Sequence, residues 1–169
     1  MKPAAVLRAS CTCGQVAIEA RGAPIASVVC YCEDCQAAAR EIEALPAAAP
    51  VLDADAGTPL VMFRKDRLRC VRGQDLLSAH KLTPGSATNR YVASCCNSAM
   101  YLGFDDAKHW VDVFRKRIEG TPPPIGARVC TRFRPEGPAL PQDAPAYASF
   151  PPAMIFGIIG ARVAMMFGR

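Results

Sequence analysis

The stretch Val28–Cys35, "VVCYCEDC", places three cysteines within six residues, directly after a short apolar run. In turns of the type C-x-C and C-x-x-C, neighbouring sulfur atoms can converge about 2.3 Å from one zinc ion, which keeps them as thiolates. A structural zinc site takes four protein ligands, whereas a catalytic site takes about three and leaves one position for water or substrate. Because no histidine lies near this stretch, Cys30, Cys32 and Cys35 predict a zinc site with an open position.

A redox or disulfide role is the alternative for these thiols. Thioredoxin-like C-x-x-C motifs carry two cysteines at the head of a helix, whereas here a third cysteine lies just upstream. The N-terminal apolar run Ala4–Leu7 is too short for the core of a secretory signal, so we expect the protein in the cytoplasm. Thiols stay reduced there, and nine cysteines, an odd number, suit a complete disulfide framework poorly. Metal binding is therefore favoured.

Two further cysteine pairs accompany the first stretch. Cys11 and Cys13 lie in "CTCG", before the alternating run Val16–Ala20, which is typical of a half-buried strand. Cys95 and Cys96 lie in "ASCCNSAMYL", before another short apolar run. The cysteines of these three groups are therefore not scattered at random along the chain.

The composition describes one soluble globular domain with or without an appendage. The chain has 169 residues, of which 51% are hydrophobic and 21% charged, which is enough to bury a core. The net charge of +5 is a modest excess, and no dense basic patch of the kind that binds nucleic acid stands out. We therefore expect no nucleic-acid partner.

The chain up to about Thr131 is predicted to be mostly β, with short strands separated by turns. One helix is expected over Glu33–Ala44, which is rich in alanine and has acidic residues in its first turn. Single cysteines at Cys70 and Cys130 are interpreted as small buried hydrophobic residues. The predicted strands are Gln15–Glu19, Ile25–Cys30, Leu60–Phe63, Leu68–Val71, Leu76–Lys81, Tyr91–Ala93, Met100–Leu102 and Val111–Phe114.

The C-terminal part differs in character, so we expect a β domain over residues 1–133 and a tail over 134–169. The tail begins with the Pro-rich, extended stretch Arg134–Pro152 and ends with the apolar sequence "AMIFGIIGARVAMMFGR". That sequence falls short of the roughly 20 residues that span a bilayer, so no transmembrane segment is expected. A helix that packs on its own domain or on a second subunit of a homodimer is favoured over an interfacial membrane anchor.

The order of the motifs resembles the glutathione-dependent formaldehyde-activating enzyme (GFA) family, which is related to centromere protein V. The shared order is C-x-C-G-x-V, then C-x-C-x-x-C, then a late cysteine pair before an apolar strand, over about residues 8–115. The resemblance implies a tent-like β fold of short antiparallel strands with two Zn²⁺ sites. One site would be structural, and the other would accept a thiol such as glutathione or its adduct.

Carried over residue by residue, the resemblance assigns Cys11 and Cys13 to the structural zinc, together with the late cysteine pair. It assigns Cys30, Cys32 and Cys35 to the open, catalytic zinc site. The middle motif matches the family fully.

The late motif departs from the family pattern C-x-x-C-G. If Cys95 is the first family cysteine, the second falls on Ser98. If the strand "SAMYL" sets the register, Cys96 takes the place of the second cysteine and Asn97 that of the glycine. We favour the latter, because asparagine adopts the left-handed conformation of such a turn more readily than other non-glycine residues. Cys95 then stands in for the missing ligand, and a site of three thiolates and a water is the alternative.

Two functions follow from this pattern. The first is a zinc-dependent carbon–sulfur lyase that acts on a thiol adduct such as S-hydroxymethylglutathione. The second is a zinc-stabilised, non-catalytic binding module. Candidates near the substrate are Tyr31 and His80, although either could simply pack in the fold. The basic residues Arg64, Lys65, Arg67, Arg69, Arg72, Arg115, Lys116 and Arg117 could attract an anionic thiol or form a solvated face.

Overall fold

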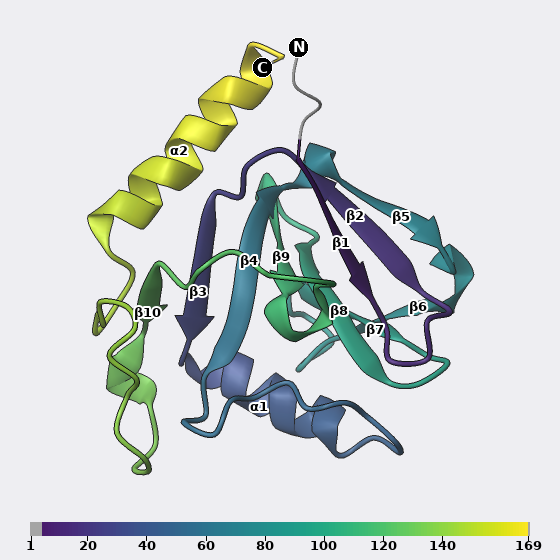
Figure 1. Cartoon of the computed structure of the whole chain (residues 1–169), viewed down its shortest axis with the longest axis horizontal. Coiled ribbons are helices and arrows are strands. Elements are labelled where there is room, and N and C mark those ends of the chain that lie inside the picture. The colour runs from purple at the N-terminus through teal and green to yellow at the C-terminus, as the bar shows by residue number, and fades with distance from the viewer. Residues whose placement is uncertain (1–4, 169) are drawn as a thin grey trace.

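The computed structural model describes residues 5–168, which form two β-sheets and two α-helices (Figure 1). The strands are β1 Val6–Ser10, β2 Ala17–Arg21, β3 Ala26–Cys30, β4 Thr58–Arg64, β5 Leu68–Arg72, β6 Leu77–His80, β7 Thr88–Ala93, β8 Ser98–Phe104, β9 Trp110–Phe114 and β10 Ala127–Val129; the helices are α1 Glu33–Glu43 and α2 Pro152–Met166. The smaller sheet has the order β1-β2-β5, and the larger has the order β10-β3-β4-β9-β8-β7-β6.

The predicted mostly-β fold class is confirmed, including the helix after the middle cysteine motif and the C-terminal helix. All eight predicted strands exist, with boundaries that differ by at most three residues. The strands β1 and β10 were missed. The strand β10 has only three residues and pairs in parallel with β3, about a hundred residues away, whereas the other strand pairs are antiparallel. No local pattern of hydrophobic residues encodes such a pairing.

The strand β4 is buried on both faces and separates two apolar cores. Val61 and Phe63 pack with Ile18 of β2, on the side of the three-stranded sheet. Leu60 packs on the other side with Ile42 of α1. Because successive side chains of a strand point to opposite faces, β4 lets the large sheet contact the small sheet on one face and the helices on the other.

The helix α1 places two cysteines at its first turn. Its N-cap residue is Cys32, whose extended backbone (φ −63°, ψ 153°) ends the segment that leaves β3. Glu33 and Asp34 follow in the first turn, where negative side chains stabilise the positive end of a helix dipole. Ala38, Ala39 and Ile42 form the buried face, so packing against the sheet fixes the orientation of the helix.

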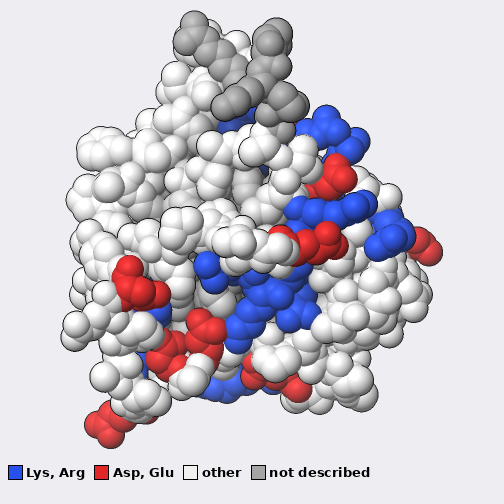
Figure 2. All heavy atoms as spheres, in the orientation of Figure 1, with Lys and Arg blue, Asp and Glu red and all other residues white. Residues whose placement is uncertain are grey.

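The helix α2 packs on the domain with part of its apolar surface and leaves much of the rest exposed. Met154 packs against the core, and the Ile158 carbonyl accepts a 2.8 Å hydrogen bond from Nε2 of the buried His109. Phe156 and Ile159 are exposed, and the side of the molecule that α2 occupies carries almost no charged side chains (Figure 2). None of the helices within residues 5–168 is long and apolar enough to cross a lipid bilayer. The expected contact of α2 with a second subunit stays a prediction.

Deletion of residues 153–169 should uncover the apolar face of the large sheet beside β3 and β4. We expect lower solubility, stronger binding of a hydrophobic dye and a changed elution volume in size-exclusion chromatography, because exposed apolar patches promote association. The zinc content should not change, because both cysteine clusters lie outside the deleted segment. If the truncated protein had the same solubility, dye binding and elution volume as the full chain, α2 would not cover an apolar surface of the sheet.

Candidate metal centres and the adjoining cavity

Four cysteines predicted for the structural site lie together, and we call Cys11, Cys13, Cys95 and Cys96 the four-cysteine cluster. Their sulfur atoms all lie within 4.8 Å of one another. The Sγ atom of Cys11 lies 3.6 Å from that of Cys13 and 3.9 Å from that of Cys95, and all four thiols are free. Four sulfurs arranged tetrahedrally at zinc–sulfur distances of 2.3 Å would lie about 3.8 Å apart. The cluster therefore fits a structural zinc ion in ligand type, number and spacing.

A sharp turn between β7 and β8 brings two adjacent cysteines to the same side. The N–H of Cys96 donates a hydrogen bond to the carbonyl of Ala93, and Asn97 has a left-handed backbone with φ 51°. This is the conformation expected for Asn97 in the favoured register. Because the turn breaks the strand alternation, the sulfur atoms of Cys95 and Cys96 both reach the cluster.

Ser98, the alternative fourth residue, supports this turn through hydrogen bonds. It is fully buried, and its Oγ accepts a 3.1 Å hydrogen bond from the N–H of Thr12. The same oxygen lies 3.2 Å from the Sγ atom of Cys96. Burial alone would raise the pKa of Cys96, but hydrogen bonds from Ser98 and Thr12 lower it to about 5. Ser98 thus joins the two cysteine turns and favours a thiolate at Cys96.

A second group, the three-cysteine cluster of Cys30, Cys32 and Cys35, lies where β3 meets α1. These sulfur atoms also lie within 4.8 Å of one another. Hydrogen bonds from the thiols of Cys30 and Cys35 lower the pKa of Cys32 to about 3, and the positive charge of Arg90 adds to this effect. The N-terminus of α1 favours negative charge at the same place. The three-cysteine cluster therefore suits a metal ion with one position left for another ligand.

Cys130 lies next to this cluster, which the sequence did not reveal. Val129 pairs with Cys30 across β10 and β3, and Cys130 follows in a left-handed conformation with φ 61°. A hydrogen bond with the Cys130 thiol is the largest cause that raises the pKa of Cys30. The predicted burial of Cys130 is correct, but its description as an isolated residue is wrong. Its sulfur is not among those that lie within 4.8 Å of one another.

Tyr31 lies between Cys30 and Cys32 and holds the cysteine loop in place through hydrogen bonds on the side away from the cavity. Its hydroxyl donates a 2.8 Å hydrogen bond to Oδ2 of Asp55 and accepts one of 2.6 Å from Nη1 of Arg128. Burial and the bond to Asp55 raise the pKa of Tyr31 to about 12, so the hydroxyl keeps its proton. Nε2 of Gln36 also donates to the Tyr31 carbonyl, at 2.6 Å. Tyr31 therefore fixes the cysteine loop and is not among the residues that line the cavity described next.

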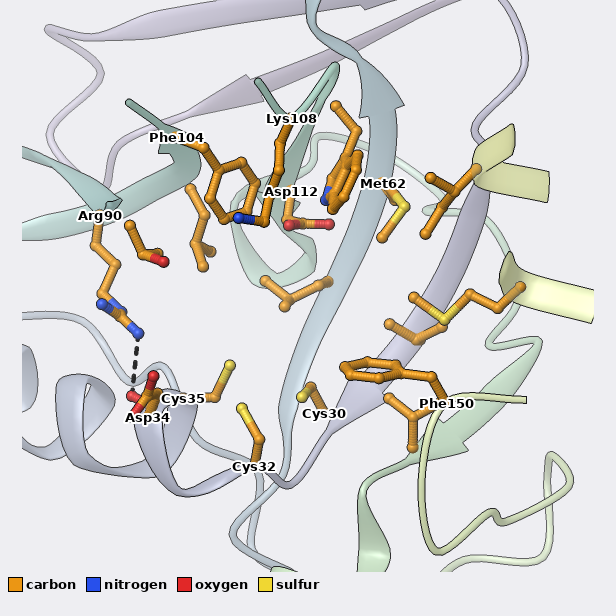
Figure 3. A pocket seen from close by; sticks show the side chains of 18 of the residues that line it. Cys30, Cys32, Asp34, Cys35, Met62, Arg90, Phe104, Lys108, Asp112 and Phe150 are labelled. Carbon is orange, nitrogen blue, oxygen red and sulfur yellow. Dashed lines mark hydrogen bonds between the residues drawn. The ribbon is translucent and has the colours of Figure 1, made fainter. Parts of the chain in front are cut away.

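A cavity of about 430 Å³ adjoins the three-cysteine cluster (Figure 3). One face of the large sheet forms its floor, and α2 forms the opposite wall together with Phe150. The cysteines lie at one end, at the start of α1, and Asp112 lies toward the other (Figure 3). Apolar side chains dominate the lining, among them Val28, Leu60, Met62, Leu102, Met154 and Ile158.

Two buried charged residues line this cavity without a charged partner among the described residues. Arg90 of β7 is 3% exposed; its Nη2 donates to the carbonyl of Asp34 at 3.1 Å, while Nη1 has no hydrogen-bond partner. Asp112 of β9 is 6% exposed, and burial alone raises its pKa to about 7. Sequence reasoning missed both. The sequence could have indicated Asp112, because it is a charged residue in the middle of the otherwise apolar strand "WVDVF".

The charged residues that the sequence did suggest lie elsewhere. Arg69 pairs with Glu19 at 2.6 Å, and His80 lies 2.8 Å from a carboxylate oxygen of Glu41. His109, as noted for α2, bonds to a backbone carbonyl. None of the eight basic residues singled out in the sequence is among those that line the cavity within residues 5–168.

Comparisons with known proteins show a matching family model and a similar solved structure. Residues 6–115 match the family model described as glutathione-dependent formaldehyde-activating enzyme, a range that holds both cysteine clusters. A crystal structure of a Rhodobacter sphaeroides protein is also similar, with 19% sequence identity and a TM-score of 0.48; the match covers 69% of this chain and 91% of that chain. Among proteins with curated descriptions, none is significantly similar.

Replacement Cys11→Ser should release metal and destabilise the protein by about 3 kcal/mol or more, since binding of a structural zinc contributes directly to folding. For a chain of this size the melting temperature would fall by roughly 10 °C, measured by calorimetry alongside metal analysis. Cys70→Ser is the matched control, because Cys70 lies outside both clusters and should keep the full metal content. If both variants had the same melting temperature and the same metal content, the prediction of a structural metal site would be wrong.

Proposed function

This chain belongs to the family of glutathione-dependent formaldehyde-activating enzymes, and from that premise we propose that it is a zinc-dependent carbon–sulfur lyase. Its substrate would be a hydroxymethyl adduct of a thiol, the class of compound to which S-hydroxymethylglutathione belongs. The observation that carries the proposal is the three-cysteine cluster, in which three sulfur atoms converge beside a cavity. Because the cluster needs reduced thiols, we place the protein in the cytoplasm.

The proposed reaction breaks the bond between sulfur and carbon in the adduct. The sulfur keeps the electron pair and leaves as a thiolate, while the hydroxyl group loses its proton and becomes the carbonyl oxygen of the aldehyde. A zinc ion held by Cys30, Cys32 and Cys35 would supply a Lewis acid for the sulfur. The reverse reaction forms the adduct from the same two molecules.

The chain's own residues would stabilise negative charge at this place. Arg90 is buried, and its positive charge lowers the pKa of Cys32. The N-terminus of α1, with its positive dipole end, lies at the same end of the cavity, where Cys32, Asp34 and Cys35 line it. These groups would favour a thiolate over a thiol, and they are fixed in place before the substrate binds.

A zinc-stabilised binding module is the second candidate, and the position of Cys130 favours it. Cys130 belongs to the same core cluster as Cys30, and its thiol raises the pKa of the Cys30 thiol. A small shift of the segment after β10 would bring a fourth sulfur to the ion and close the site. A closed site of four thiolates is structural and leaves no position for a substrate.

Binding of a small thiol to the zinc-loaded protein should release a proton, because the thiol would enter as a thiolate. Titration calorimetry in buffers of different ionisation enthalpy counts that proton. Cys32→Ser should abolish both thiol binding and any lyase activity, and should cost less stability than Cys11→Ser. Cys130→Ser is the matched control, which should bind thiol with proton release as the native protein does.

Two results would count against the lyase. In the first, the native protein binds no thiol while Cys130→Ser binds it with proton release, which means that Cys130 closes the site. If neither protein binds a thiol, the cluster only stabilises the fold, and the binding module replaces the enzyme.

A further inference from the structure

We propose that the thiol bound in this cavity has an apolar body and a hydrogen-bond donor far from its sulfur, and that it is not glutathione. The inference rests on the lyase function proposed above and names its substrate class. The sulfur would lie at the three-cysteine cluster, the apolar body between the large sheet and α2, and the donor at Asp112.

The apolar body is indicated by the two walls of the cavity. On the sheet side, Leu60 and Met62 of β4 lie at alternate positions and so present one continuous apolar face. On the other side, Met154 and Ile158 of α2 close over that face. A ligand that binds between these walls loses its contact with water on both sides. This favours a hydrocarbon body over charged groups.

The wall formed by α2 also lies outside the part of the chain that matches the family. The match ends at residue 115, whereas α2 and Phe150 come after it. The apolar wall that α2 and Phe150 add to the cavity therefore lies beyond the matched region, and it makes the cavity better suited to an apolar thiol.

Glutathione fits this cavity poorly because it carries two carboxylates and one ammonium group. Among the cationic side chains that line the cavity in the described chain, Arg90 has one free nitrogen, Nη1, and Lys108 is already paired with Asp106. Arg90 could pair with one carboxylate of glutathione, but the second would have to compete with Asp106 for Lys108. Burying an unpaired charge is strongly unfavourable.

The hydrogen-bond donor is indicated by the place of Asp112 in the sheet. In the strand register Asp112 of β9 pairs with Met62 of β4 on one side and with Leu102 of β8 on the other. Leu102 in turn pairs with Arg90 of β7. Two strand spacings, about 10 Å, separate the backbones of Asp112 and Arg90. No ion pair or hydrogen bond engages the Asp112 side chain within residues 5–168, so this carboxyl group has no partner in its apolar surroundings.

Because the Asp112 carboxyl group lines an apolar cavity and meets no protein donor, a ligand that donates a hydrogen bond to it would gain free energy of binding. A hydroxyl or amide N–H on the ligand would do so. In Figure 3 the Asp112 side chain and the three cysteines occupy opposite ends of the same cavity, which fits a ligand with its two polar groups at its two ends.

Fluorescence of Trp110 can test this, because it is the only tryptophan of the chain and lines the cavity. We would titrate the zinc-loaded full-length protein with mercaptohexanol, hexanethiol, hexanol and glutathione. Mercaptohexanol should bind at least about tenfold more tightly than glutathione and than hexanol, which lacks the sulfur. It should also bind more tightly than hexanethiol, which lacks the donor.

Matched variants test separately the contact with the apolar wall of α2 and the hydrogen bond with Asp112. Ile158→Asp, in the wall of the cavity, should weaken mercaptohexanol binding by about tenfold or more, whereas Ile159→Asp, at the next and exposed position, should not. Asp112→Leu should bind mercaptohexanol and hexanethiol equally, and because it replaces a buried charge by an apolar side chain it should still fold.

Three outcomes would overturn the inference. If glutathione binds as tightly as mercaptohexanol, the substrate class is wrong while the lyase function stands. If hexanol binds as tightly as mercaptohexanol, the cavity takes apolar molecules without using the cysteines. If no thiol changes the fluorescence or the calorimetric heat, the lyase function fails together with the inference.

Discussion

The convergence of sulfur atoms from distant parts of the chain is the constraint on which this structure depends. Cys13, after β1, lies 3.3 Å from Cys95, between β7 and β8, in the sulfur-to-sulfur distance. Thiolates this close repel one another unless a cation lies between them. A metal ion would therefore join the small sheet to the large one and set how they pack. The shared core of Ile18, Val61 and Phe63 lies beneath that link.

The two cysteine clusters show how the same ligand gives different chemistry in different surroundings. The four-cysteine cluster has a full set of ligands, held by the turn at Asn97 and by Ser98. The three-cysteine cluster lies at the end of a cavity, with the start of α1 and the charge of Arg90 beside it. The first arrangement suits a cross-link, and the second suits a site that accepts a further ligand.

Local sequence patterns predicted the mostly-β fold and α1, because these depend on residues close together in the chain. The grouping of Cys11 and Cys13 with Cys95 and Cys96 was instead implied by the family resemblance. The left-handed conformation of Asn97 was expected because Asn97 takes the place of the glycine in the family's motif. The patterns missed Cys130, Arg90 and Asp112, whose surroundings come from strand pairing and from α2 packing on the sheet. The basic residues of the sequence were candidates for attracting an anionic thiol. Arg69, however, pairs with Glu19 away from the cavity. Long-range pairing decides these positions, and hydrophobic periodicity does not encode it.

X-ray absorption at the zinc edge, with and without added mercaptohexanol, tests the central claim most directly. The account predicts two zinc ions per chain, one bound by four sulfurs and the other by three sulfurs and a lighter atom. Added thiol should replace the lighter atom, so that both ions then have four sulfur ligands. Four sulfurs on both ions before the thiol is added, with no change afterwards, would contradict the open site.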